Sequence, residues 1–251
     1  IKEVPQVLRR ARGYAPAPIN LPSGFDNIPP ILAMGSELKN TFCLFRDGQA
    51  ILSQHIGDLE NSLAVAAYQK TLNLFLDLLD SETKTIVVDK HPEYLSTKLG
   101  KDLAEANDLK VIEVQHHHSH IVACMAENGL DIDCNSVLGI ALDGLGYGED
   151  GTIWGGEFLL ANYHGFKRLG TLKPVAMIGG EQAIYQPWRN TYAHLVAAFG
   201  LDFLKNYEGL ELFNFFQAKP LASLNQMMEK KINSPLALSL IHISEPTRRS
   251  M

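Results

Sequence analysis

The spacing of apolar residues divides the chain into short strand-like runs and longer helix-like runs. Apolar side chains recur at helical spacing over residues 62–79, and a second helix is expected over 95–107. Short apolar runs at 85–89 and 109–114 are typical of strands, and both read as buried. Strands that alternate with helices in this way predict an α/β fold.

The remaining pattern adds antiparallel pairing to this picture. An Asp-Gly pair at 47–48 separates two strand-like runs, which is a strong signal for a hairpin. Further strands are expected over 136–142, which also reads as buried, and over 154–163, and a helix over 187–200. A hairpin at the start of an otherwise alternating pattern predicts a mixed sheet.

Proline and arginine are frequent in residues 1 to about 30, which is typical of an extended connector or the end of a preceding domain. The chain does not begin with Met, and no apolar segment follows its basic N-terminal residues, so a signal peptide is not expected. We expect the sequence to be a piece of a longer chain.

Composition narrows the class of protein. The 251 residues are 46% hydrophobic and 20% charged, as in an ordinary globular protein, and the net charge of −6 disfavours binding to nucleic acid. No apolar run reaches the roughly 18–20 residues that span a bilayer, so no membrane association is expected. The three cysteines, Cys43, Cys124 and Cys134, form no CxxC pair, which favours a cytoplasmic location.

Four of the nine histidines lie within residues 116–120. If a helix begins at His116, His120 lies four residues on and on the same face, so the pair could supply two ligands to one metal ion. The HxxxH pattern lacks the glutamate of HExxH, which disfavours a zinc protease. His117 and His118 would point elsewhere. The alternative is that all four are polar residues that form local hydrogen bonds at a helix start.

A carboxylate and three glycines follow the strand expected over 136–142. Asp143 is expected where this strand ends, and Gly144, Gly146 and Gly148 come after it in a predicted turn. Ligands of α/β sheets gather at such strand ends, where Asp143 could complete the histidine pair and the glycines could approach a phosphate. The alternative is a tight hairpin in which Asp143 caps the turn.

Two further segments are candidate ligand loops. Gly35, Glu37, Lys39 and Asn40 lie between two apolar runs, where Lys39 could meet a phosphate, although a simple polar turn is equally compatible. The segment GGEQAIYQPWR (179–189) is either a second ligand loop or the lead-in to a helix.

Together these motifs resemble the hydrogenase maturation carbamoyltransferase family, HypF. The resemblance runs from Leu8 to about Ala237 through RRARGYAPAPINLP, ILAMGSELKNTF, LSQHIGDLEN, VQHHHSHIVACMAENGL, ALDGLGYGEDGTIWGGEFL, GGEQAIYQPWR and INSPL. It implies that residues 1–28 are the end of a YrdC-like domain and a linker. Residues 29–237 would be part of a Kae1-like domain of the actin/Hsp70/sugar-kinase fold, with a first lobe on a mixed sheet and an incomplete second lobe.

The resemblance also implies a chemistry. The family is a carbamoyltransferase that makes carbamoyl adenylate from carbamoyl phosphate and ATP, an ATP-dependent, ligase-type reaction in which Mg²⁺ is expected. It passes the carbamoyl group to the C-terminal cysteine of its partner HypE. Its divalent metal, Fe or Zn, would fall on His116, His120 and Asp143, and its phosphate-contacting turns on Gly35 to Asn40 and Asp143 to Gly148. No catalytic residue is assigned, and a later aspartate ligand of the family has no match in the chain.

The C-terminus departs from the family. From about Leu238 the sequence LSLIHISEPTR matches one reading frame of a common transposase sequencing adapter, so residues 238–251 are expected not to be native. Without the later segments of the family, we expect the chain alone to be inactive. Two alternatives are a tRNA threonylcarbamoyl-transfer protein of the Kae1 superfamily, which the RRARGYAPAPI lead-in and QHHHSH disfavour, and a non-catalytic metal- or nucleotide-binding module.

Overall fold

The computed structural model describes residues 14–80, 82–206 and 211–237. The first part of the expected connector, residues 1–13, and the expected adapter-derived segment, residues 238–251, lie outside this described part.

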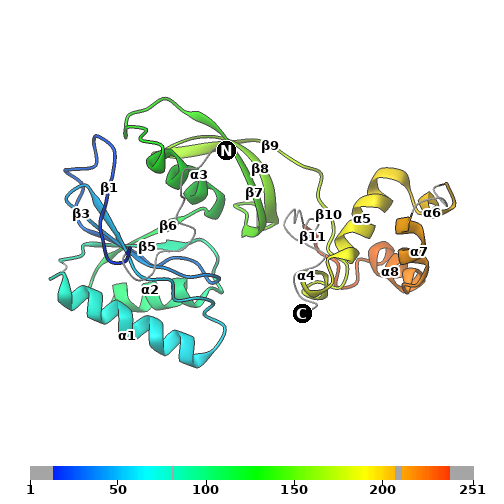
Figure 1. Ribbon diagram of the computed structural model, residues 1–251, viewed down its shortest axis with the longest axis horizontal. Coiled ribbons are helices and arrows are strands. Elements are labelled where there is room, and N and C mark those ends of the chain that lie inside the picture. The colour runs from blue at the N-terminus through cyan, green and yellow to red at the C-terminus, as the bar shows by residue number, and fades with distance from the viewer. Residues whose placement is uncertain (1–13, 81, 207–210, 238–251) are drawn as a thin grey trace. The chain divides into compact units, whose positions relative to one another are not determined.

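The chain forms two compact units (Figure 1). Unit 1 contains the residues up to Ser136 together with Ala161–Gly165, and unit 2 contains Val137–Leu160 and the residues from Phe166 onward.

A six-stranded mixed sheet organises unit 1, with the strand order β1-β4-β3-β2-β5-β6. Strands β1 to β4 are joined by antiparallel pairs, and β2, β5 and β6 run parallel to one another. The strands are β1 (Ile19–Asn20), β2 (Ile31–Ala33), β3 (Cys43–Arg46), β4 (Gln49–Leu52), β5 (Thr85–Asp89) and β6 (Lys110–Val114). The mixed sheet expected from the sequence is therefore present.

The expected hairpin joins β3 to β4. Asp47 and Gly48 form its two-residue turn with φ values of 49° and 71°, the left-handed conformation that Asp-Gly adopts readily. Part of the proline-rich lead-in also joins this sheet, because Ile19 of β1 pairs with Ala50 of β4.

Two helices cover one face of the unit 1 sheet (Figure 1): α1 (Ser62–Leu78) and α2 (Leu95–Ala106). Both match the helices predicted from apolar spacing. The Asn61 side chain begins α1 by accepting a hydrogen bond from the backbone N–H of Ala64 at 2.9 Å. The buried core between the layers comprises Leu32, Met34, Phe42, Leu44, Ile51, Leu59, Tyr68, Leu72, Phe75, Ile86, Val88 and Ala104.

Helix α3 (His116–Glu127), which follows β6, carries the histidine cluster. The predicted helix start at His116 is confirmed, and Gln115 caps it by accepting a hydrogen bond from the backbone N–H of His118 at 2.9 Å. The burial predicted for the strand at 109–114 is wrong, because β6 is the edge strand of the sheet and its Ile112 is exposed, whereas β5 lies inside the sheet.

Unit 2 is built on a second sheet with the order β10-β11-β8-β7, and β9 also pairs with β8. Its strands are β7 (Val137–Tyr147), β8 (Ile153–Asn162), β9 (Gly165–Thr171), β10 (Val175–Ala176) and β11 (Leu236–Ala237).

Strand β7 differs from its prediction in two ways. It does not end at Asp143 but continues to Tyr147, so the turn expected after Asp143 is wrong, and the chain turns near residues 149–151 instead. Strand β7 is also not fully buried, because it is an edge strand and Leu138, Ile140 and Leu142 point to an exposed face. An apolar run alone does not distinguish a central strand from an edge strand.

The helices of unit 2 gather around a second core. They are α4 (Gln182–Tyr185), α5 (Trp188–Phe199), α6 (Phe203–Asn206), α7 (Glu211–Gln217) and α8 (Leu221–Glu229). The core residues are Val175, Ile178, Tyr192, Ala193, Phe203, Phe216 and Leu224. Helix α5 matches the helix predicted over 187–200 and ends at Gly200, whose φ of 82° favours glycine.

The predicted mixed α/β fold class is confirmed by this arrangement. Among the residues described, no helix is both long enough and apolar enough to cross a membrane.

Candidate metal centre

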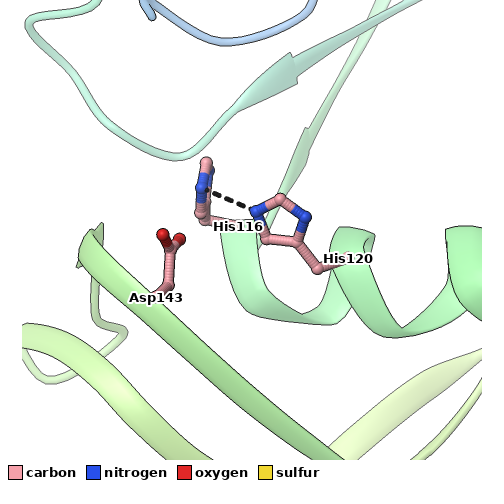
Figure 2. A group of neighbouring side chains, drawn as sticks. All are labelled: His116, His120 and Asp143. Atoms are coloured by element: carbon pink, nitrogen blue, oxygen red, sulfur yellow. Dashed lines mark hydrogen bonds between the residues drawn. The ribbon is translucent and has the colours of Figure 1, made fainter. Parts of the chain in front are cut away.

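Two histidines meet on the first turn of α3. The Nε2 atoms of His116 and His120 lie 3.1 Å apart, within hydrogen-bond distance (Figure 2). The rings are nearly perpendicular, with their centroids 4.7 Å apart. The helical spacing of four residues therefore places both side chains on one face, as the sequence predicted.

The separation of the two Nε2 atoms suits a shared metal ion. Two imidazole nitrogens that each lie about 2.1 Å from one ion, at angles between octahedral and tetrahedral values, are about 3.0–3.4 Å apart. The observed 3.1 Å between His116 and His120 falls in this range.

A carboxylate that was not among the predicted ligands holds one of these rings. The Asp89 Oδ2 atom lies 2.7 Å from Nδ1 of His116, and Asp89 is almost fully buried at the end of β5. Its other oxygen, Oδ1, accepts the backbone N–H of His91 at 2.8 Å. The sequence did offer a signal for Asp89 as a site residue, because it is a carboxylate at the carboxyl end of a predicted strand. Asp143 was predicted as a ligand from the same kind of position.

The other two histidines of the cluster anchor α3. His117 is fully buried, and its Nδ1 lies 3.2 Å from the Gln115 side-chain amide. His118 Nε2 lies 2.8 Å from the backbone oxygen of Asn162, within the same unit. The cluster is thus divided by the helix into a facing pair and two anchoring side chains.

A fifth histidine borders the pair on the loop after β5. His91 stacks on Tyr94 with ring centroids 4.0 Å apart, and its Nδ1 accepts the backbone N–H of Glu93 at 3.2 Å. Burial lowers the pKa of His91, and the neighbouring Asp89 and Glu93 carboxylates act in the opposite direction. His91 is therefore biased toward the neutral form.

The predicted third ligand, Asp143, belongs to unit 2. It lies within β7 and is partly exposed, and its Oδ1 accepts the backbone N–H of Gly144 at 2.6 Å. Like the two histidines, it offers one ligand atom of a type that metal ions bind. Figure 2 draws all three side chains.

The glycines after Asp143 are packed closely. Gly144 and Gly146 are buried within β7, and Gly148 lies at the following turn, where a Cβ atom would fall 2.1 Å from Nε1 of Trp154. The Asp150 side chain fixes this turn, because its Oδ1 accepts hydrogen bonds from the backbone N–H of Thr152 and from Trp154 Nε1. The hydrogen bond from the Thr152 hydroxyl lowers the pKa of Asp150 most, and these two hydrogen bonds and the Arg168 guanidinium lower it further.

The second candidate loop is held by its own side chains. Glu37 accepts the backbone N–H of Leu95 at 2.7 Å and so occupies the N-terminus of α2; partial burial nevertheless raises its pKa. Asn40 is buried and donates to the backbone oxygens of Met34 and Ser36.

Gly35 and Lys39 in this loop both have left-handed backbone conformations, with φ values of 74° and 52°. The Lys39 side chain is exposed. Of the four residues predicted here, Lys39 therefore has the side chain most accessible to a ligand.

The segment at 179–189 forms a compact lead-in to α5. Gly179 and Gly180 have φ values of 86° and 55°, and a Cβ atom on Gly179 would lie 2.9 Å from the Arg189 guanidinium. The Nε of Arg189 donates to the side chain of Gln186 at 2.8 Å. These contacts account for both glycines and for the arginine through packing.

Two family models match the chain along most of its length. Residues 26–127 match the HypF Kae1-like domain, and residues 139–240 match the second subdomain of the Kae1-like domain of carbamoyltransferase. The boundary between the two matches falls close to the boundary between units 1 and 2.

Curated relatives agree with this assignment. The chain is 41% identical over 235 residues to the carbamoyltransferase HypF of Rhodobacter capsulatus, covering 94% of this chain and 31% of the relative. It is 43% identical over 229 residues to that of Synechocystis sp., covering 90% of this chain and 29% of the relative. The chain thus spans about a third of the length of the relatives it matches.

Solved structures show the same relationship. A crystal structure of full-length HypF in the phosphate- and nucleotide-bound form matches with a TM-score of 0.80 and 38% identity, over 93% of this chain and 29% of that one. The crystal structure of T. kodakarensis HypF matches with a TM-score of 0.77 and 33% identity, over 94% of this chain and 31% of that one. The fold and the two family models therefore define a Kae1-like α/β protein. Within that class, the chain belongs to the HypF carbamoyltransferase family.

Proposed function

We propose that this chain is the Kae1-like portion of a cytoplasmic carbamoyltransferase that acts in hydrogenase maturation. The whole protein would use carbamoyl phosphate and ATP, with Mg²⁺, to make carbamoyl adenylate, and would carbamoylate the C-terminal cysteine of HypE. Membership of the HypF family supports this proposal, as does the likeness to a HypF structure with phosphate and nucleotide bound.

The observation that carries the proposal is the 3.1 Å separation of the His116 and His120 Nε2 atoms. We propose that this pair and Asp143 bind one divalent ion, because two imidazoles and a carboxylate suit Zn²⁺ or Fe²⁺. Such an ion, when bound, would polarise a carbonyl and hold phosphate oxygens.

The chain's own residues would prepare the site in distinct ways. His117 and His118 hold the first turn of α3 in place, so that the facing pair needs no reorganisation on binding. The turn from Gly35 to Asn40 would contact nucleotide phosphate through the exposed Lys39, while Glu37 and Asn40 keep its shape. The segment from Asp143 to Gly148, which comprises the end of β7 and the start of the following turn, would contact phosphate through the backbone of its glycines.

In the transfer step, the thiolate of the acceptor cysteine would form a bond to the carbamoyl carbon. The bond from that carbon to the adenylate oxygen would break, and AMP would leave with the electron pair. The product would be a thiocarbamate on the acceptor protein.

Metal analysis tests the site. Purified chain should retain one equivalent of Zn²⁺ or Fe²⁺ by elemental analysis, and His116→Ala and His120→Ala should each lose it. His164→Ala is the matched control, since its exposed side chain lies outside the cluster and its loss should leave the metal content unchanged. Equal metal content in the unsubstituted chain and in all three variants would contradict the proposed metal site.

A chimera tests the activity. In this chimera, residues 14–237 replace the matching segment of Rhodobacter capsulatus HypF. The Rhodobacter protein supplies the remaining segments. We expect carbamoyl transfer to HypE, detected as a mass increase of one carbamoyl group, and its loss in His116→Ala. A chimera that retains its metal yet transfers no carbamoyl group would favour the alternative, a metal-binding module without catalysis.

A further inference from the structure

The register of two parallel strands brings Asp89 to the histidine pair. Asp89 is the last residue of β5 and pairs with Val114, the last residue of β6. His116 follows Val114 by two residues and begins α3. The carboxylate at the end of one strand therefore meets the imidazole that begins the helix after the neighbouring strand, at 2.7 Å.

The Asp89 carboxylate is held on both sides. Its Oδ1 accepts the N–H of His91 while its Oδ2 faces His116, and its backbone oxygen accepts the Thr97 hydroxyl at 3.0 Å. An ionised carboxylate only accepts hydrogen bonds, so the proton in this contact must lie on Nδ1 of His116. The Nε2 of His116 then carries a lone pair, and this is the atom that faces His120.

We propose that Asp89 is a positioning residue that fixes His116 in the Nδ1–H tautomer and so presents Nε2 as a metal-ligand atom. This inference rests on the proposed metal centre and adds a residue to it. Histidine ligands commonly donate their second ring N–H to a carboxylate, which fixes the ring orientation and raises the basicity of the ligand nitrogen.

Asp89→Asn separates this role from simple support of the loop after β5. The amide has almost the shape of the carboxylate but only one oxygen. If that oxygen keeps the His91 N–H, the NH₂ group faces Nδ1 of His116, which must then accept. The ring is driven to the Nε2–H tautomer, in which the ligand atom is blocked.

The test compares the His116 tautomer in the unsubstituted chain and in Asp89→Asn. The tautomer is measured in the metal-free proteins by ¹⁵N NMR of labelled histidine, and His116→Ala identifies the signal of His116. We expect Nδ1–H for the wild-type chain and Nε2–H for Asp89→Asn. Zn²⁺ titration should show affinity lowered by about 10- to 100-fold. Asp131→Asn is the matched control, because Asp131 also accepts a backbone N–H, from Ser23, but does not touch the histidines.

An unchanged His116 tautomer in Asp89→Asn would overturn the inference, as would Zn²⁺ affinity equal to that of the wild-type chain. A lowered affinity in Asp131→Asn equal to that in Asp89→Asn would also overturn it, since the effect would then be general. If the wild-type chain binds no metal, the proposed metal centre fails, and the tautomer comparison still decides whether Asp89 sets the state of His116.

Discussion

The buried carboxylate of Glu157 accepts a hydrogen bond from Nε of Arg168 at 2.7 Å. The Glu157 side chain is 1% exposed, whereas that of Arg168 is 29% exposed and stacks over the Trp154 ring. Thr171 also donates to this carboxylate. The pair therefore joins β8 to β9 through a buried ion pair, in which the Glu157 carboxylate is shielded from solvent.

Arg168→Ala should destabilise unit 2 by about 3 kcal/mol, because it leaves Glu157 buried without its cation. Both tryptophans of the chain, Trp154 and Trp188, lie in unit 2, so tryptophan fluorescence during urea unfolding reports on this unit. Lys167→Ala, at the exposed neighbouring position, should change the midpoint little. If both variants unfold at the same urea concentration, the ion pair does not stabilise the unit.

Gln115→Ala should destabilise α3 by about 1 kcal/mol, the usual effect of removing a helix N-cap. It removes the acceptor for the His118 N–H and the contact to His117. Circular dichroism during thermal unfolding measures the loss. Gln115→Glu keeps an acceptor oxygen and should recover part of the stability; no recovery would mean that the cap is not the source of the effect.

Gly100→Ala should destabilise unit 1 by about 1–3 kcal/mol through overpacking, although alanine favours a helix interior by about 1 kcal/mol. A Cβ atom at this position in α2 would lie 2.6 Å from Val88 Cγ1 and 2.8 Å from Met34 Cγ. Asp102→Ala, at an exposed position of the same helix, is the control and should be nearly neutral. A Gly100→Ala protein that melts higher than the parent would show that the sheet can move away from the helix.

His194→Leu should stabilise unit 2, and more strongly in mild acid. The Nε2 of His194 is buried without a hydrogen-bond partner among the described residues, and burial lowers its pKa from the ordinary value of 6.5. As pH falls through that ordinary value, the unfolded chain takes up a proton before the folded chain does, so the parent loses stability. The leucine variant lacks this loss.

Urea unfolding at about pH 7.5 and about pH 5.5 checks the sign of this effect. The stability difference between His194→Leu and the parent should grow at the lower pH. A difference that shrinks in acid would contradict the assigned direction of the pKa shift.

Local patterns predicted much of unit 1. Apolar spacing predicted α1, α2 and β5, and Asp-Gly predicted the hairpin, because these elements depend on residues close together in the chain. The facing histidines were predictable for the same reason, since a spacing of four residues defines one helical face.

The contacts that complete the centre depend on long-range register. Asp89 lies 27 residues before His116, and only the pairing of β5 with β6 brings them together. The anchoring contact from His118 to Asn162 spans 44 residues. Strand β7 was misread at Asp143 because glycine suggests a turn, whereas here the glycines continue the strand.

If the proposed metal centre holds an ion, the pairing of Asp89 with Val114 would make retention of that ion depend on the edge strand β6. Among the described residues, β6, like β1 at the other edge, has a neighbouring strand on one side only, so hydrogen exchange should find it opening early. A slip of one residue would carry Asp89 about 3.3 Å along the strand and out of reach of His116. Loss of bound metal on warming would then report the loosening of β6 before the core of unit 1 melts.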